Sequence, residues 1–241
     1  MKTGKKMKIE IWSDVMCPFC YIGKRNFETA LAQFADKEHI EVEWKSFQLD
    51  PSIPAVATET YEEYLVKRKG MPPAQVKGML QNVTNTAKQV GLDYDFDRSQ
   101  MVNSHKAHQL IQFAKSKQKG DEAEERLFRA FFTEGERISD TTTLIRLGQE
   151  IGLDEQELKT IFSDEKYVKL VDADIQEAQS IGVSGVPFFV VDRKYAISGA
   201  QPPQAFAETL EKSFTEWRKQ NPESPFEVIE GQSCSIDGTC E

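Results

Sequence analysis

The amino-acid sequence predicts an α/β protein in which a large all-helical insertion interrupts a single sheet. Two observations support this prediction. Strand-like segments occur near the two ends of the 241-residue chain, whereas residues 58–181 consist of successive amphipathic segments with helical spacing. The order strand, helix, strand at the start also implies a parallel pair of strands joined by a crossover.

The first part of the α/β domain is expected within residues 1–57. The segment KIEIWSDV predicts a strand through alternation around Ile9 and Ile11, and apolar side chains have helical spacing from Tyr21 to Phe34. A second alternating segment, IEVEWKSFQL from Ile40 to Leu49, predicts the next strand, and two prolines end that pattern.

The inserted helical domain is expected to occupy residues 58–181. It contains amphipathic segments such as AHQLIQFAKSK, DEAEERLFRAFFTEG and TTTLIRLGQEIG. Asp140 and Asp154 stand where two of the helices should begin, because aspartate is a preferred N-cap residue. The stripe formed by Leu127, Phe128, Phe131 and Phe132 has helical spacing and is most simply core packing, although one edge could line a substrate groove.

Residues 182–220 should complete the discontinuous α/β domain. The segments VPFFVVD, from Val186 to Asp192, and YAISG predict a hairpin, and a last helix is expected from about Gln204 to Lys219. After this helix, two prolines lead into a C-terminal tail, residues 221–241, which contains a second pair of cysteines.

Composition and charge argue against several classes of function. Asp and Glu outnumber Lys and Arg by 39 to 30, and the formal net charge of −9 without a basic patch disfavours nucleic-acid binding. No apolar run approaches the roughly 18 residues of a membrane span, and no stretch of signal-peptide length follows the basic start. We therefore expect a cytoplasmic protein without membrane partners, of unspecified oligomeric state. Closely spaced cysteines in that compartment are more often catalytic or metal-binding than structural.

The segment MCPFC at residues 16–20 is the main candidate for chemistry. Pro18 suits the first position of a helix, since its missing N–H would be unsatisfied there, and Cys17 is then expected at the N-cap. From there, hydrogen bonds from free backbone amides and the helix dipole would favour the thiolate of Cys17. Cys20 would lie one turn inside, more buried but within reach of Cys17, and so placed to resolve a mixed disulfide.

The remaining cysteines, Cys234 and Cys240, leave other interpretations open. Four cysteines could complete a zinc site, but five residues separate the second pair and Pro18 fits a helix start better than a metal knuckle. The tail pair could form a small disulfide loop, or it could exchange disulfides with Cys17. Four cysteines allow three pairings, and the sequence does not select among them.

A second candidate segment, GVSGVPFFVV, contains Pro187 at the start of a predicted strand. Proline is sterically tolerated at that position, which is the simplest interpretation. A cis bond before Pro187 would instead turn the chain sharply and leave the backbone N–H and C=O of Val186 free to face an extended substrate.

Together these segments resemble a known family over nearly the whole chain, the DsbA-like branch of the thioredoxin superfamily. SDVMCPFCYIGKRNFE and GVSGVPFFVVDRKYAISGAQ are similar to the cytoplasmic FrnE-type oxidoreductases. The resemblance implies a thioredoxin-like fold with a helical insertion. It also implies thiol–disulfide oxidoreductase activity, of the protein disulfide isomerase kind, on disulfide- or thiol-containing proteins or small thiols.

The resemblance also implies roles for individual residues. Cys17 corresponds to the nucleophile, Cys20 to the resolving thiol and Pro187 to a cis-proline facing them, with Val186, Pro18 and Phe19 beside the substrate. No metal, nucleotide or flavin cofactor is implied, and glutathione is a candidate co-substrate.

One departure and one rival function follow from the same comparison. Phe19 stands where the periplasmic oxidants of the family have a histidine, so we expect a weaker oxidant than those proteins.

Related glutathione-dependent isomerases of the 2-hydroxychromene-2-carboxylate type and kappa-class glutathione transferases typically present a serine to glutathione. Cys17 with Cys20 would instead oxidise glutathione or form a mixed disulfide with it. Isomerase or transferase is therefore the alternative function, and a purely binding role would require an inert cysteine pair.

His105 and His108 lie one helical turn apart and could ligate metal or act as acid and base. The simpler expectation places one in the core and the other at the surface, because no Glu-containing zinc motif accompanies them.

Overall fold

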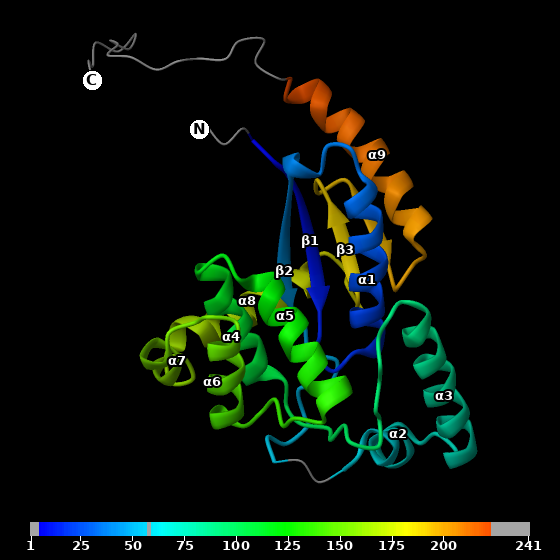
Figure 1. Ribbon diagram of the computed structural model, residues 1–241, viewed down its shortest axis with the longest axis vertical. Helices are drawn as coiled ribbons and strands as arrows, with labels where there is room; N and C mark the ends of the chain where they lie inside the picture. The colour runs from blue at the N-terminus through cyan, green and yellow to red at the C-terminus, as the bar shows by residue number, and fades with distance from the viewer. Residues whose placement is uncertain (1–4, 57–58, 223–241) are drawn as a thin grey trace.

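The computed structural model describes residues 5–56 and 59–222, and these residues contain a four-stranded mixed sheet (Figure 1). The strand order is β2-β1-β3-β4; β1 pairs with β2 in parallel and with β3 in antiparallel, and β3 and β4 form an antiparallel hairpin. Both the parallel crossover and the hairpin expected from the sequence are confirmed. The strands are β1 (Met7–Ser13), β2 (Ile40–Ser46), β3 (Phe188–Val191) and β4 (Tyr195–Ser198).

Helices cover both faces of this sheet. On one face, α1 (Pro18–Gln33) packs beside α9 (Pro203–Gln220), and the ring of Phe27 lies 5.6 Å from that of Phe189 and 5.7 Å from that of Phe206. On the other face, α8 (Glu165–Ser180) contacts β2, and the indole N–H of Trp12 donates to the backbone oxygen of Asp174 at 2.9 Å. The sheet is therefore the middle layer of three.

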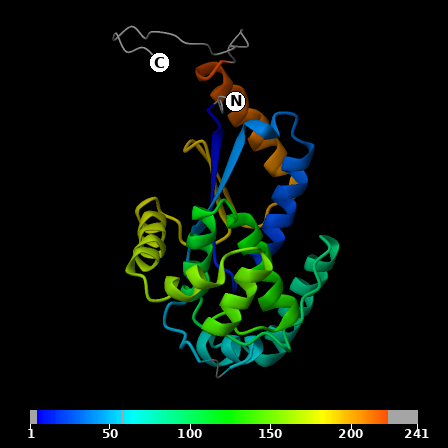
Figure 2. The ribbon, with the colours of Figure 1, turned by 60° about the vertical axis from the view of Figure 1, so that its left-hand side comes forward.

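The other helices gather at the end of the sheet where β1 and β2 finish (Figures 1 and 2). As the sequence predicts, they lie between β2 and β3 in the chain, and their core includes the fully buried Leu127, Phe128, Phe131 and Phe132. Asp140 and Asp154 cap two of them through their side chains, which confirms their expected roles. These helices are α2 (Tyr61–Lys69), α3 (Pro73–Gln89), α4 (His105–Ser116), α5 (Gly120–Arg129), α6 (Thr141–Glu150) and α7 (Glu155–Ile161).

Two short turns complete the elements. A 3-10 turn spans Lys37–His39 before β2, and a π-helical turn, Ala130–Glu134, extends α5. No helix within the described residues is both long and apolar enough to cross a bilayer.

The first two strands end earlier than the sequence predicts, at Ser13 and Ser46, because Asp14 folds the chain away from the sheet. The third strand begins at Phe188, later than the predicted start at Val186. The backbone oxygen of Asp14 accepts the N–H of Cys17 at 2.8 Å, and its carboxylate accepts the N–H of Met16 at 3.2 Å. The other carboxylate oxygen accepts the N–H of Leu49 at 2.8 Å, so the chain after β2 is also tied to this turn. The residues after β1 therefore form the loop that presents Cys17.

Candidate active site

The CPFC segment forms the first turn of α1, at the end of the sheet where the helices of the insertion gather. Pro18 is the first helical residue and Cys17 is the N-cap, as the sequence predicts. The sulfur of Cys17 does not accept the expected hydrogen bond from a backbone amide. Instead, its S–H group donates across the site to the backbone oxygen of Val186, at 3.5 Å.

The Val186–Pro187 bond opposite Cys17 is cis, which confirms the sharper of the two interpretations. The backbone oxygen of Pro187 accepts the N–H of Gly199 at 2.8 Å, so β4 holds this loop. On the other side, Gly23 of α1 allows a close approach, because a Cβ atom at that position would lie 3.0 Å from Cγ of Pro187. The cis-proline loop is thus fixed between α1 and the hairpin.

The two cysteines occupy different environments. Both are free thiols; Cys17 is 5% exposed and Cys20 only 1%. Burial, together with the adjacent Cys17, raises the pKa of Cys20 well above its usual value, although the Asp14 backbone and the Ser13 hydroxyl act in the opposite direction. Cys20 therefore keeps its proton at neutral pH, as suits the second thiol in a reaction sequence.

Two tyrosines from the helical region reach the backbone on either side of Cys17. The hydroxyl of Tyr61 donates to the oxygen of Met16 at 3.2 Å, and that of Tyr94 donates to the oxygen of Pro18 at 2.7 Å. Burial, followed by the nearby Cys17, raises the pKa of both hydroxyls. They therefore remain hydrogen-bond donors at neutral pH. Neither tyrosine stands out in the sequence, because nothing in the spacing of the two residues shows which carbonyl each hydroxyl reaches.

A group of buried polar side chains lies behind the CPFC turn. His108 is fully buried, with Nε2 3.6 Å from a carboxylate oxygen of Asp14, whereas His105 lies nearer the surface, 3.5 Å from Asp172. This confirms that one histidine of the pair belongs to the core and the other to the surface. Glu124 is also fully buried, and burial raises its pKa to about 8.

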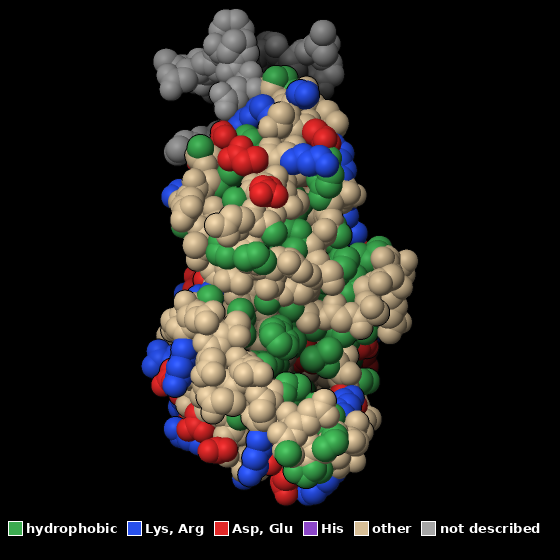
Figure 3. All heavy atoms as spheres, turned by 90° about the vertical axis from the view of Figure 1, so that its right-hand side faces the viewer, with side chains coloured by type: hydrophobic (Ala, Val, Ile, Leu, Met, Phe, Trp, Pro, Cys, Tyr) green, Lys and Arg blue, Asp and Glu red, His purple; other side chains and the backbone are tan. Residues whose placement is uncertain are grey.

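A hollow lined by uncharged side chains begins at the CPFC segment. The side chain of Phe19 is 46% exposed and borders a hollow of about 470 Å³ against one face of α3. The middle of this side of the molecule is largely hydrophobic or uncharged, with charged side chains towards its two ends (Figure 3). The residues lining the hollow are Phe19, Gln75, Gly78, Met79, Asn82, Val83 and Thr86.

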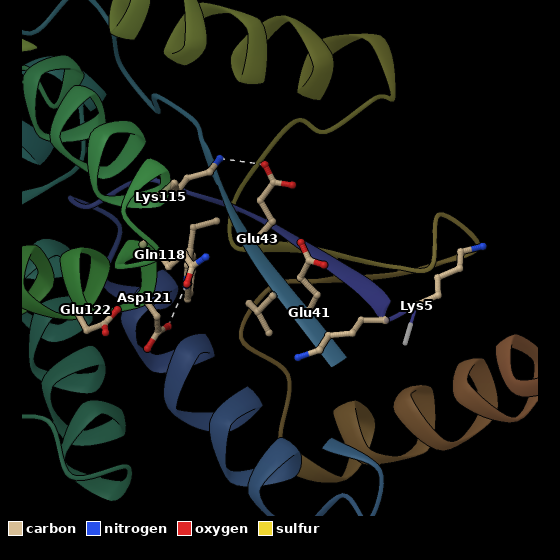
Figure 4. A pocket seen from close by; sticks show the side chains of 11 residues that line it. Lys5, Glu41, Glu43, Lys115, Gln118, Asp121 and Glu122 are labelled. Atoms are coloured by element: carbon tan, nitrogen blue, oxygen red, sulfur yellow. Dashed lines mark hydrogen bonds and ion pairs between the residues drawn. The ribbon is translucent and has the colours of Figure 1, made fainter. Parts of the chain in front are cut away.

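A second hollow, of about 950 Å³, lies along the outer edge of β2 (Figure 4). Charged side chains line much of it, and two of them pair directly: the ammonium of Lys115 lies 3.0 Å from the carboxylate of Glu43. The hollow contains neither cysteine of the CPFC segment, so its size alone does not make it the active site.

The metal interpretation depends on residues that the structure does not describe. Cys234 and Cys240, needed to complete a four-cysteine zinc shell, lie outside the described residues, as does any disulfide they form. Within residues 5–56 and 59–222, the single cluster of potential metal ligands is Asp36, Glu38 and His39, which includes neither Cys17 nor Cys20.

Comparison with known proteins identifies the family. The model of the DSBA-like thioredoxin domain matches residues 8–211. The chain belongs to the DSBA-like thioredoxin domain family. The family assignment places the four-stranded sheet and its helical insertion in the DsbA-like thioredoxin fold, and places the chain among DsbA-like oxidoreductases.

Individual known proteins resemble the chain to different degrees. The probable DsbA oxidoreductase SCO1869 from Streptomyces coelicolor is 32% identical, with 98% of each chain covered and a TM-score of 0.83. The Bacillus subtilis (strain 168) protein YwbO is 29% identical over 206 residues, which cover 84% of this chain and 94% of YwbO. The cytosolic disulfide reductase DsbM from Pseudomonas aeruginosa, solved with GSH, is 18% identical over 86% of this chain and 99% of DsbM, with a TM-score of 0.62. At that identity, the likeness to DsbM concerns the fold alone.

Proposed function

We propose that the protein is a thiol–disulfide oxidoreductase in which Cys17 and Cys20 form the redox pair. The observation that carries this proposal is the position of the Cys17 sulfur. It lies at the start of α1, 3.5 Å from the backbone oxygen of Val186 and next to a cis-proline, with the more buried Cys20 one turn inside the helix. The membership of the DSBA-like family supports the same chemistry.

The reaction proceeds in two exchanges. The thiolate of Cys17 attacks one sulfur of a substrate disulfide, forms a mixed disulfide and releases the first substrate thiolate, which takes up a proton. Cys20 then loses its proton and attacks the sulfur of Cys17, which closes the Cys17–Cys20 disulfide and releases the second substrate thiolate. Two electrons pass from the protein to the substrate, and the reverse sequence oxidises a substrate dithiol. The relative reduction potentials set the net direction.

The substrate is a disulfide- or thiol-containing protein or a small thiol. An extended substrate segment can lie along the backbone of Val186, because Val186 precedes β3 and lies outside the sheet, and the next residue, Pro187, has no N–H of its own. The uncharged hollow beside Phe19 favours an apolar side chain near the substrate cysteine. Glutathione is a candidate co-substrate and the cytoplasm the proposed compartment; DsbM, a cytosolic reductase solved with GSH, has the same fold.

Cysteine variants test the proposal directly. In a C234S/C240S background, which removes the tail thiols, C17S should abolish glutathione-driven reduction of a labelled peptide disulfide. C20S should instead accumulate a mixed disulfide between Cys17 and the peptide, detected by mass spectrometry under non-reducing conditions. Turnover by C17S at the rate of the background protein would refute the mechanism.

A further inference from the structure

Two tyrosine hydroxyl groups from outside α1 donate hydrogen bonds to the backbone on either side of Cys17. Tyr61, the first residue of α2, donates to the oxygen of Met16, and Tyr94, between α3 and α4, donates to the oxygen of Pro18. Met16 and Pro18 are the immediate neighbours of Cys17. Side chains of the helical region therefore hold the Met16–Cys17 peptide group before the sulfur-bearing residue and the Pro18–Phe19 peptide group after it.

Tyr94 is itself fixed by the π-helical turn Ala130–Glu134. Its ring stacks on that of Phe132, with centroids 4.6 Å apart, and the backbone oxygen of Phe132 accepts the N–H of Asp95 at 2.7 Å. The hydroxyl of Thr133 donates to the backbone oxygen of Asp93 at 2.8 Å. A π-turn changes the regular helical hydrogen-bond pattern and can leave carbonyls for other partners. Here these contacts hold the segment carrying Tyr94.

Contacts within the helical region fix Tyr61 as well as they fix Tyr94. Its backbone N–H donates to the oxygen of Ser99 at 3.2 Å, and its ring lies 5.0 Å from that of Phe96. A capping box formed by Thr60 and Glu63 fixes the first turn of α2, where Tyr61 lies. The position of each hydroxyl is thus set by packing within the helical region and does not depend on the cysteine.

Holding these carbonyls affects the sulfur between them. A carbonyl oxygen carries partial negative charge, and one turned towards Cys17 would disfavour its thiolate. A hydroxyl that engages the oxygen offsets this charge and keeps the peptide plane from rotating. The N–H groups at the start of α1 then stay directed towards the N-cap side of the turn, where negative charge is stabilised.

We propose that Tyr61 and Tyr94 are positioning residues for thiol–disulfide exchange: they hold the peptide groups on both sides of Cys17, so that its sulfur faces Val186 and an incoming disulfide. This inference rests on the proposed function. It also assigns the helical region a part in the reactivity of Cys17, in addition to any part in substrate selection.

The test measures the reaction of Cys17 alone. In a C20S/C234S/C240S background, the second-order rate constant for reaction with 4,4′-dithiodipyridine is measured from pH 5 to 9, with Y61F and Y94F compared with the background protein. Each substitution should slow the reaction at least fivefold at pH 7, and the difference should shrink at high pH, where the thiolate forms in all variants.

Tyr64 provides a matched control. It lies on α2 one turn after Tyr61 and is similarly buried, but its hydroxyl donates to the carboxylate of Asp50, at 2.8 Å. Y64F should lose thermal stability much as the other variants do, yet react within twofold of the background protein. Rates for Y61F and Y94F within twofold of the background, or an equal slowing in Y64F, would overturn the inference.

A second measurement separates this inference from the proposed function. With both CPFC cysteines intact, turnover of a peptide disulfide is compared between the C234S/C240S background and the same protein carrying Y94F. Turnover in the background with no change in Y94F would refute the positioning role and leave the oxidoreductase function standing. No turnover in either protein would refute the function itself, while the probe rates would still decide whether the hydroxyls act on Cys17. Should Y61F fail to fold, Y94F and Y64F decide the question.

Discussion

Replacing Gly23 with alanine sets two opposing effects against each other at the active site. Alanine is favoured over glycine in a helix interior by about 0.5–1 kcal/mol. The new Cβ atom, however, would lie 3.0 Å from Cγ of Pro187 and 3.5 Å from Cζ of Phe189. Pro187 cannot move away freely, because its backbone oxygen is bonded to Gly199. Since crowding a packed site costs roughly 1–3 kcal/mol, we expect G23A to be less stable than the wild type, by about 1 kcal/mol.

Gly78, in the interior of α3, provides the matched substitution. A Cβ atom there would meet nothing within 4 Å, so G78A should gain the full preference of about 0.5–1 kcal/mol. Urea unfolding at neutral pH gives both free energies, and peptide-disulfide turnover shows whether G23A has displaced Pro187. We expect G23A to lose at least tenfold in kcat/KM. Stabilisation of G23A equal to that of G78A, with wild-type turnover, would refute the argument that the approach of α1 to Pro187 positions the site.

Three further predictions concern residues around the same turn. Because burial raises the pKa of Glu124 to about 8, from 4.5, the folded chain keeps a proton there that the unfolded chain loses. The free energy of unfolding should therefore fall as the pH rises from 5 to 8. It should fall more steeply in the wild type than in E124Q, by up to about 1.4 kcal/mol per pH unit. Equal slopes of the urea-derived free energy against pH in the two proteins would contradict this. D14A leaves the N–H groups of Met16 and Leu49 without the carboxylate that accepts them, and should lower the free energy of unfolding in urea by about 2–4 kcal/mol. A loss below about 0.5 kcal/mol would mean that water replaces the carboxylate. F19H should make the pair more oxidising, shifting its equilibrium constant with glutathione at least tenfold, and an unchanged constant would show that residue 19 does not tune it.

The elements that carry the chemistry could be predicted because local rules determine them. Proline after Cys17 marks the start of a helix, and the alternating segment around Ile9 and the apolar segment VPFFVV mark strands, whatever the rest of the chain does. The resemblance to a known family then supplied the cis bond before Pro187, which the residues alone left open. Strand ends were less predictable: Asp14 ends β1 because its carboxylate binds two backbone N–H groups, one of them 35 residues away in the chain.

The supporting residues could not be predicted because their roles arise from packing between distant segments. The spacing of Tyr61 and Tyr94 indicates burial at most, whereas their function depends on where each hydroxyl ends, 45 and 76 residues from its partner in the chain. Glu124 is harder still, since a glutamate in an acidic amphipathic helix is normally exposed. An accurate backbone arrangement is needed before any of these contacts can be inferred.

The strand order has a consequence for synthesis of the chain on the ribosome. β1 lies between β2 and β3, and β3 begins at Phe188, long after β2 ends at Ser46. At about 5–20 residues per second, translating the intervening segment takes on the order of ten seconds. During that interval one edge of β1 lacks its partner, and the Cys17 thiol has not yet met the backbone of Val186. A nascent chain therefore carries an exposed thiol before its active site exists, and chaperones or small thiols that protect it would act in this interval.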